Sequence, residues 1–197
     1  MSFNKIDLMR FKLRIGKRVL KRYTDALLAR CRRDAGPRAH LGADGAGPLE
    51  DGMHAHKAHS IAQSVASTDI ILGSDQVAHL EDGSILHKPG DFDHARAQLM
   101  RCSDQWVYFS TGICLVRGSR SLIVDSETYR IRFRPLTTPT IESYLERDRP
   151  YDCAGSIKAE GLGITLLADA EGRDVNTLYG LPLMLLTDHL INLDIIS

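Results

Sequence analysis

Two adjacent polar residues, Asp75 and Gln76, interrupt an apolar stretch and are the first candidates for chemistry. The stretch reads DIILGSDQV, so that Gly73-Ser74 separates the apolar run from a carboxylate and a carboxamide. A strand that stops in a small-residue turn commonly presents its next side chains at a surface or cleft. We therefore expect Asp75 to follow a buried strand in a position suited to catalysis, although most aspartates after strands are turn or cap residues.

The glycine-rich stretch CAGSIKAEGLG, at 153–163, is a second candidate site. It offers backbone amides together with Lys158 and Glu160, and such a loop can wrap closely around a polar ligand. Its glycine spacing matches neither GxGxxG nor GxxxxGK[ST], which argues against a Rossmann fingerprint and a P-loop. Lys88, which precedes Pro89, either binds a phosphate or is a solvated side chain before a fixed turn.

Three histidines and one cysteine invite a metal or nucleophile interpretation that their spacing does not favour. His54, His56 and His59 are two and three residues apart, whereas a helical zinc site needs an i, i+4 pair. We therefore expect solvated surface histidines. No histidine stands near Cys153 in the sequence, so this cysteine is expected to be a buried apolar residue rather than a nucleophile.

The hydrophobic periodicity predicts alternating helices and strands, with hairpin-like spacing in the middle of the chain. Helices are expected over 57–67, 91–103, 138–149 and from 180, and strands over 69–74, 106–116, 127–136 and 164–168. Arg130, Arg132 and Arg134 alternate with apolar residues and define a strand face that is either solvated or turned toward an anion. The pattern favours an α/β fold with a mixed sheet flanked by helices.

Composition narrows the class of protein. The chain has 197 residues, enough for one substantial domain, and 25 Lys and Arg balance 25 Asp and Glu. This balance gives no reason to expect a nucleic-acid polymer or an anionic membrane as partner. The four cysteines are too scattered for a CxxC pair, and neither a signal peptide nor a stretch of roughly 20 apolar residues is recognisable. We expect a cytoplasmic protein with reduced thiols.

Six motifs in a fixed order resemble the Maf family, the septum formation inhibitor-like nucleoside triphosphate pyrophosphatases. They are GSDQV, HKP, STG, RFRPLT with IESYLERDRP, CAGSIKAEGLGITL and EGRDVNTLYGLPL. The pairing of SDQ with the glycine-rich and GRDVNTLYGLP motifs is similar to the branch that acts on 7-methyl-GTP. The resemblance covers about residues 56–190, and six ordered motifs are far more specific than any one of them.

The resemblance implies a Maf-like fold with two lobes around a central cleft, and hydrolysis of a nucleotide between its α and β phosphates. A divalent cation, Mg²⁺ or Mn²⁺, would be the cofactor, a nucleoside triphosphate the substrate, and a homodimer the assembly. Asp75 matches the position of the proton acceptor. The substrate-binding positions expected from the motifs and the glycine-rich loop are Gln76 and Glu160 at the base, and Lys57, Lys88 and Lys158.

The first quarter of the chain departs from this resemblance. Residues 1–55 are rich in Ala, Gly, Arg and Asp, and the Ser-x-Ser-x-x-Arg phosphate loop of the family is not recognisable there. The expected organisation is an atypical, poorly ordered segment at 1–55, either a replacement or an out-of-frame reading, and a Maf-like core at 56–197. Loss of that loop leaves an alternative open, a catalytically impaired relative that only binds nucleotide or a protein partner.

Overall fold

The computed structural model describes residues 53–63, 67 and 69–196. The atypical segment expected at 1–55 therefore lies outside the described residues, except for residues 53–55. The described helices and strands are α2 (Met53–Ala62), β1 (Ile70–Leu80), α3 (Phe92–Cys102), β2 (Trp106–Arg117), β3 (Arg120–Phe133), α4 (Thr138–Asp148), β4 (Leu167–Glu171) and α5 (Leu183–Asn192), with short 3₁₀ helices η1 (Ala154–Ser156), η2 (Leu162–Leu166) and η3 (Val175–Thr177).

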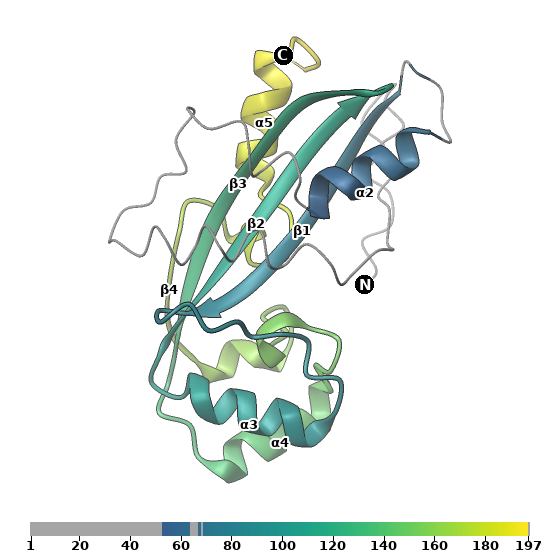
Figure 1. Cartoon of the computed structure of the whole chain (residues 1–197). Coiled ribbons are helices and arrows are strands. Elements are labelled where there is room, and N and C mark those ends of the chain that lie inside the picture. The colour runs from purple at the N-terminus through teal and green to yellow at the C-terminus, as the bar shows by residue number, and fades with distance from the viewer. Residues whose placement is uncertain (1–52, 64–66, 68, 197) are drawn as a thin grey trace. The chain divides into compact units, whose positions relative to one another are not determined.

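The strands form a four-stranded sheet in the order β1-β2-β3-β4. β1 and β2 run in opposite directions (Figure 1). A two-residue connection joins β2 to β3, a length that only an antiparallel hairpin allows, and Gly118 supplies the positive φ of 59° at this turn. β3 also pairs antiparallel with β4, with Arg130 opposite Glu171. The expected α/β class is confirmed, and the sheet is antiparallel.

The chain divides into two compact units, and β1, β2 and β3 each contribute residues to both. In its described part, the first unit holds residues up to Asp75 together with Gly112–Ser126, and the second holds Gln76–Thr111 and the chain from Glu127 onward. A small cluster of buried residues forms the core of the first unit: Ala55, Ala58, Ile71, Cys114 and Val116. This cluster fixes α2 against the strands of its own unit.

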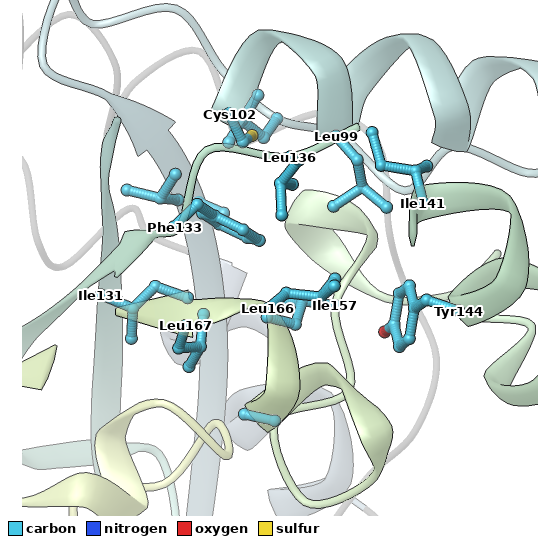
Figure 2. Close-up of a cluster of buried hydrophobic side chains, with 14 of the residues drawn as sticks. Leu99, Cys102, Ile131, Phe133, Leu136, Ile141, Tyr144, Ile157, Leu166 and Leu167 are labelled. Carbon is cyan, nitrogen blue, oxygen red and sulfur yellow. The ribbon is translucent and has the colours of Figure 1, made fainter. Parts of the chain in front are cut away.

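The second unit has the larger apolar core (Figure 2). α3 and α4 lie side by side and bury Leu99, Ile141 and Leu145 against Ile131 and Phe133 of β3 (Figure 1). Full burial of each such side chain stabilises the fold by about 1.5–3 kcal/mol. The core therefore holds the strand ends and the glycine-rich loop of this unit in place.

Two α-helices of this unit, α3 and α4, begin at residues suited to capping. The Asp91 side chain accepts a hydrogen bond from the His94 amide at the start of α3, and Thr137 caps α4, with Pro139 in its first turn. α4 ends at Arg149, whose φ of 45° places it in the left-handed region. The predicted helices at 91–103 and 138–149 are thus confirmed to within a residue or two at each end.

The arginine face of β3 is turned toward the protein's own carboxylates. The Arg130 guanidinium lies 2.5 Å from Glu171 Oε2 and 4.3 Å from the centre of the Trp106 ring, and Arg132 pairs with Asp104 at 3.0 Å. The anion that the alternation suggested is therefore supplied, for these two arginines, by carboxylates of the same unit.

Three predicted strands differ from the observed ones. The strand expected over 127–136 is observed as β3, which begins at Arg120 and ends at Phe133. The strand expected over 164–168 begins only at Leu167, because residues 162–166 form the 3₁₀ helix η2. The strand expected to stop at Gly73-Ser74 continues to Leu80. No helix within the described parts of the chain combines the length and the apolar character needed to cross a membrane.

Candidate active site

Asp75 lies in the middle of β1 and is held by an ion pair with Lys57 of α2. The Lys57 Nζ atom donates to Asp75 Oδ1 at 2.5 Å and to the Ser74 carbonyl oxygen at 3.0 Å. Only 11% of the Lys57 side chain and 21% of the Asp75 side chain are exposed. Charge-assisted hydrogen bonds of this kind are short and directional, so the carboxylate is held in one orientation.

Gly73 determines how closely α2 approaches β1. A Cβ atom at this position would collide with the His54 carbonyl oxygen and lie 2.9 Å from the Ala58 amide nitrogen. The glycine therefore marks a close approach between a helix and a strand. Our prediction of a turn at Gly73-Ser74 was wrong for this reason: the backbone stays extended, and Asp75 is presented from within the strand.

The Ser74 side chain ties the same part of β1 to β2. Its Oγ atom donates a hydrogen bond to the Gly112 carbonyl oxygen at 3.1 Å. The Asp75 carboxylate is thus flanked by contacts to a helix and to the adjacent strand. Both contacts lie within one unit, and together they provide a rigid support for a group that must be positioned accurately.

His54 is completely buried, so the expectation of a surface histidine was wrong at this position. Its ring lies directly against β2, because a Cβ at Gly112 would be 2.6 Å from His54 Nδ1. Burial lowers the pKa of His54 from 6.5 to about 4; nearby Asp75 opposes this shift and Lys57 adds to it. The imidazole is therefore neutral at pH 7.

The other two histidines show no metal-binding arrangement. His56 is exposed, and His59 Nε2 lies 2.9 Å from Ser121 Oγ. Across residues 53–63, 67 and 69–196, no group of three or more His, Cys, Asp or Glu side chains is arranged to hold a metal ion.

Gln76, the next residue of β1, belongs to the second unit and joins a polar network there. Its Nε2 atom donates to Thr111 Oγ1 at 3.1 Å, to the Thr177 carbonyl oxygen at 2.7 Å and to the Leu178 carbonyl oxygen at 3.2 Å. The carboxamide oxygen Oε1 takes part in none of these three bonds. The network connects β1 and β2 with the segment that carries η3.

Asp174 organises the η3 segment, and our sequence analysis did not single it out. The buried carboxylate accepts hydrogen bonds from the Asn176 amide, the Asn176 side chain and the Met184 amide at 2.7–2.9 Å. Burial alone would raise the pKa of Asp174, but these hydrogen bonds outweigh it and hold the pKa below its usual value. The Asp-x-Asn spacing in GRDVNTL is a turn signal that predicts such a contact.

The glycine-rich loop is built around Lys158. The Lys158 ammonium donates to the Asp148 carbonyl oxygen at 2.7 Å and to the Arg149 carbonyl oxygen at 3.4 Å, at the C-terminus of α4. Gly163 is required because a Cβ there would collide with the Lys158 carbonyl oxygen. An ammonium has three N–H donors, so one N–H of Lys158 takes part in neither of these two contacts.

The remaining predicted site residues are surface side chains of this second unit. Glu160 and Lys88 are both exposed. Cys153 is partly exposed rather than buried as expected, and burial raises the pKa of its thiol to about 11. A thiol with this pKa is protonated at neutral pH, which agrees with the expectation that Cys153 is not a nucleophile.

Comparison with known sequences identifies the family. A family model described as "Maf-like protein" matches residues 45–193. The chain belongs to the Maf family. The matched region includes Asp75, the Gln76 network and the glycine-rich loop, so every candidate site residue of this Maf-family chain lies inside it.

Named relatives of this Maf-family chain include several proteins called 7-methyl-GTP pyrophosphatase. The one from Pseudomonas syringae pv. tomato is 49% identical over 123 residues, covering 62% of this chain and 64% of the relative. The one from Nitrosococcus oceani is 42% identical over 144 residues, covering 70% and 71%. The one from Chromohalobacter salexigens is 50% identical over 122 residues, covering 61% and 63%. The chain thus spans less than two thirds of the length of some of these relatives.

Proposed function

We propose that this Maf-family chain is a nucleoside triphosphate pyrophosphatase, with 7-methyl-GTP as its most favoured substrate. The observation that carries the proposal is the Lys57–Asp75 ion pair, which places an oriented carboxylate and a cation side by side within one unit. A triphosphate hydrolase needs both, a base for water and positive charge for phosphate oxygens. The names of relatives 42–50% identical to the chain support the choice of substrate.

In the proposed reaction, Asp75 accepts a proton from the attacking water. The water oxygen forms a new bond to the α phosphorus, the bond from that phosphorus to the bridging oxygen breaks, and pyrophosphate leaves with the electron pair. Lys57 holds Asp75 Oδ1, so Oδ2 is the oxygen that faces the water. A positioned general base typically accelerates such a step by about 10²–10⁴-fold.

A divalent cation, Mg²⁺ or Mn²⁺, is proposed as cofactor and arrives with the triphosphate. Asp75 is the residue that would contact it, which fits the small number of protein ligands that Mg²⁺ needs when phosphates complete its coordination. The cation would neutralise charge that develops on the leaving pyrophosphate. Lys88 and Lys158 are proposed as further substrate-binding residues.

Gln76 and Glu160 are proposed to recognise the base. A 7-methylated guanine ring is cationic and carries N–H donors on its edge, so an exposed carboxylate such as Glu160 suits it in both charge and hydrogen bonding. We also place the protein in the cytoplasm, where nucleotides occur and thiols such as Cys102 and Cys153 stay reduced. A homodimer is part of the same proposal, and light scattering of the purified chain tests it.

The direct test is pyrophosphate release by the purified full chain from 7-methyl-GTP, GTP, UTP and dTTP, with Mg²⁺ or Mn²⁺. We expect kcat/KM for 7-methyl-GTP to exceed that for GTP by about tenfold or more, a difference of about 1.4 kcal/mol. Absence of turnover with every nucleotide from a folded sample would contradict the proposal. That result would favour the impaired relative suggested by the unrecognised Ser-x-Ser-x-x-Arg loop.

A further inference from the structure

The contacts of the Gln76 carboxamide determine which of its two ends is available to a ligand. Two of its three partners are the backbone carbonyl oxygens of Thr177 and Leu178, at 2.7 and 3.2 Å. Backbone carbonyl oxygens only accept hydrogen bonds, so they require the NH₂ end of the carboxamide. A flipped carboxamide would place oxygen against oxygen at 2.7 Å and leave two carbonyl groups without this donor.

Thr111 is the third partner, and its contact independently requires the NH₂ end of the Gln76 carboxamide. Its hydroxyl group has one hydrogen, which is donated to the Thr177 carbonyl oxygen at 2.9 Å in a buried contact. The Thr111 oxygen must therefore accept at its 3.1 Å contact with Gln76 Nε2. The Thr111 hydroxyl thus accepts a hydrogen bond from Gln76 and donates one to the backbone of η3, and neither bond can be reversed.

The far side of this network is anchored as well. Thr177 is buried, and its own hydroxyl donates to Glu127 Oε1 at 2.6 Å. The backbone amide of Thr177 bonds to the Asp174 carbonyl oxygen at 3.0 Å. The two carbonyl groups that Gln76 contacts are consequently held by β3 on one side and by the Asp174 turn on the other.

We propose that Thr111 is a positioning residue which fixes Gln76 as a hydrogen-bond acceptor, so that its Oε1 atom recognises an N–H donor on the base of the substrate. The proposal rests on the proposed function and adds to it the chemistry of one contact. A guanine edge carries such donors at its ring N1–H and its exocyclic amine. A base with neither donor gains nothing from Gln76 in this orientation.

The test compares base recognition in the Thr111→Val variant with that in the wild-type chain. Binding of 7-methyl-GMP is measured by calorimetry beside two analogues, one methylated at the ring N1 and one dimethylated at the exocyclic amine. In the wild-type chain, one of the two analogues should bind at least about fivefold more weakly than 7-methyl-GMP. A difference of this size corresponds to the loss of one hydrogen bond. In Thr111→Val this discrimination should fall by about twofold, because the two carbonyl contacts still require the NH₂ end but the carboxamide has lost its third anchor and is held less firmly.

Two further variants separate positioning from folding. Thr111→Ser keeps the hydroxyl and should restore the wild-type discrimination. Ser110→Ala is the matched control, since it removes a neighbouring buried hydroxyl of β2 that bonds to Thr128 instead, at 2.9 Å; it should leave discrimination unchanged. Equal discrimination in Thr111→Val and wild type would overturn the proposal, and so would a wild-type chain that binds all three ligands equally. Binding of a monophosphate requires no turnover, so failure of pyrophosphate release would count against the proposed function alone.

Discussion

The ion pair between Lys57 and Asp75 is the contact at the residue scale on which the proposed chemistry depends. Both side chains are largely withdrawn from solvent, and a pair of this kind is less screened than one on the surface. Removing one partner leaves the other charge poorly compensated. The pair should therefore matter to activity far more than the exposed ion pairs of the same protein.

We expect Lys57→Met to lower kcat for 7-methyl-GTP by about 100-fold, because the Asp75 carboxylate is no longer held in one orientation. Steady-state pyrophosphate release measures this. The matched control is Arg173→Met, which breaks the half-exposed Arg173–Asp188 pair at 2.7 Å and should leave kcat within about twofold. Equal losses in the two variants would show that Lys57 has no specific role.

His54 makes the stability of the protein depend on pH. Its pKa is about 4 in the folded protein and near 6.5 when unfolded, so the unfolded chain takes up a proton first as the pH falls. Stability from the neutral imidazole is complete above about pH 6.5 and is lost progressively toward pH 4. The loss at pH 5 should be about 2 kcal/mol, from 1.36 kcal/mol per pH unit below the unfolded pKa.

Denaturant unfolding at pH 7 and pH 5 measures this loss. His54→Phe, which fills a similar volume without titrating, should lose about 2 kcal/mol less than wild type between the two pH values. His56→Gln is the control and should behave like wild type, because His56 is exposed. An identical pH dependence in His54→Phe and wild type would mean that His54 titrates normally in the folded protein.

At this scale some features of the candidate site could be predicted from the sequence and others could not. Asp75 and Gln76 were recognisable because a carboxylate and a carboxamide interrupt an apolar strand. The burial of His54 was not recognisable, because it depends on Gly112, which is more than fifty positions away in the sequence. This glycine lies against the His54 ring only in the folded protein. Local sequence patterns carry no information about such a contact.

At the element scale, the packing of α2 on its strands depends on the absence of side chains at two glycines. Gly73 lies against the backbone of α2, and Gly112 lies against the His54 ring. These two positions allow the helix to bring Lys57 within hydrogen-bonding distance of Asp75. A larger residue at either glycine should move α2 and disturb the ion pair.

Gly112→Ala tests this packing. The added Cβ would lie 2.6 Å from His54 Nδ1, so the ring must shift, and we expect a loss of about 1–3 kcal/mol in the free energy of unfolding. Urea denaturation measures it. The double variant His54→Ala/Gly112→Ala should lose less than the sum of the two single variants, because the alanine at position 54 makes room for the new methyl group. Strict additivity would contradict a direct contact.

Most elements of the second unit were predictable because each carries its own local signal. The sequences of α3 and α4 begin with residues suited to capping, Asp91 and Thr137. The alternation of apolar residues with arginines around Arg130 predicts part of β3. The apolar run ITLLA was misassigned because short apolar runs do not distinguish a strand from a helical turn. Gly163 lies inside η2 at a position where a Cβ would collide with the Lys158 carbonyl oxygen, a contact that the apolar run itself does not reveal.

At the scale of the whole molecule, the order of the motifs was more informative than any one of them. The six motifs predicted the family, and a family model matching residues 45–193 confirms it. The resemblance implied two lobes and the described chain divides into two units, but the boundary between Asp75 and Gln76 was not apparent from the sequence. The proposed base and the proposed recognition residue are neighbours in β1 and yet have their contacts in different units.

The most direct test of the central claim compares wild type with Asp75→Asn. The measurement is single-turnover hydrolysis of 7-methyl-GTP in ¹⁸O-labelled water, beside the binding of 7-methyl-GMP. Asparagine keeps an oxygen that can accept from Lys57 but cannot take a proton from water, so the hydrolysis rate should fall by about 10²–10⁴-fold while binding changes little. In the wild-type chain the label should enter the monophosphate. Turnover by Asp75→Asn within about threefold of wild type, or label in the pyrophosphate, would contradict the assignment of Asp75 as the base for attack at the α phosphorus.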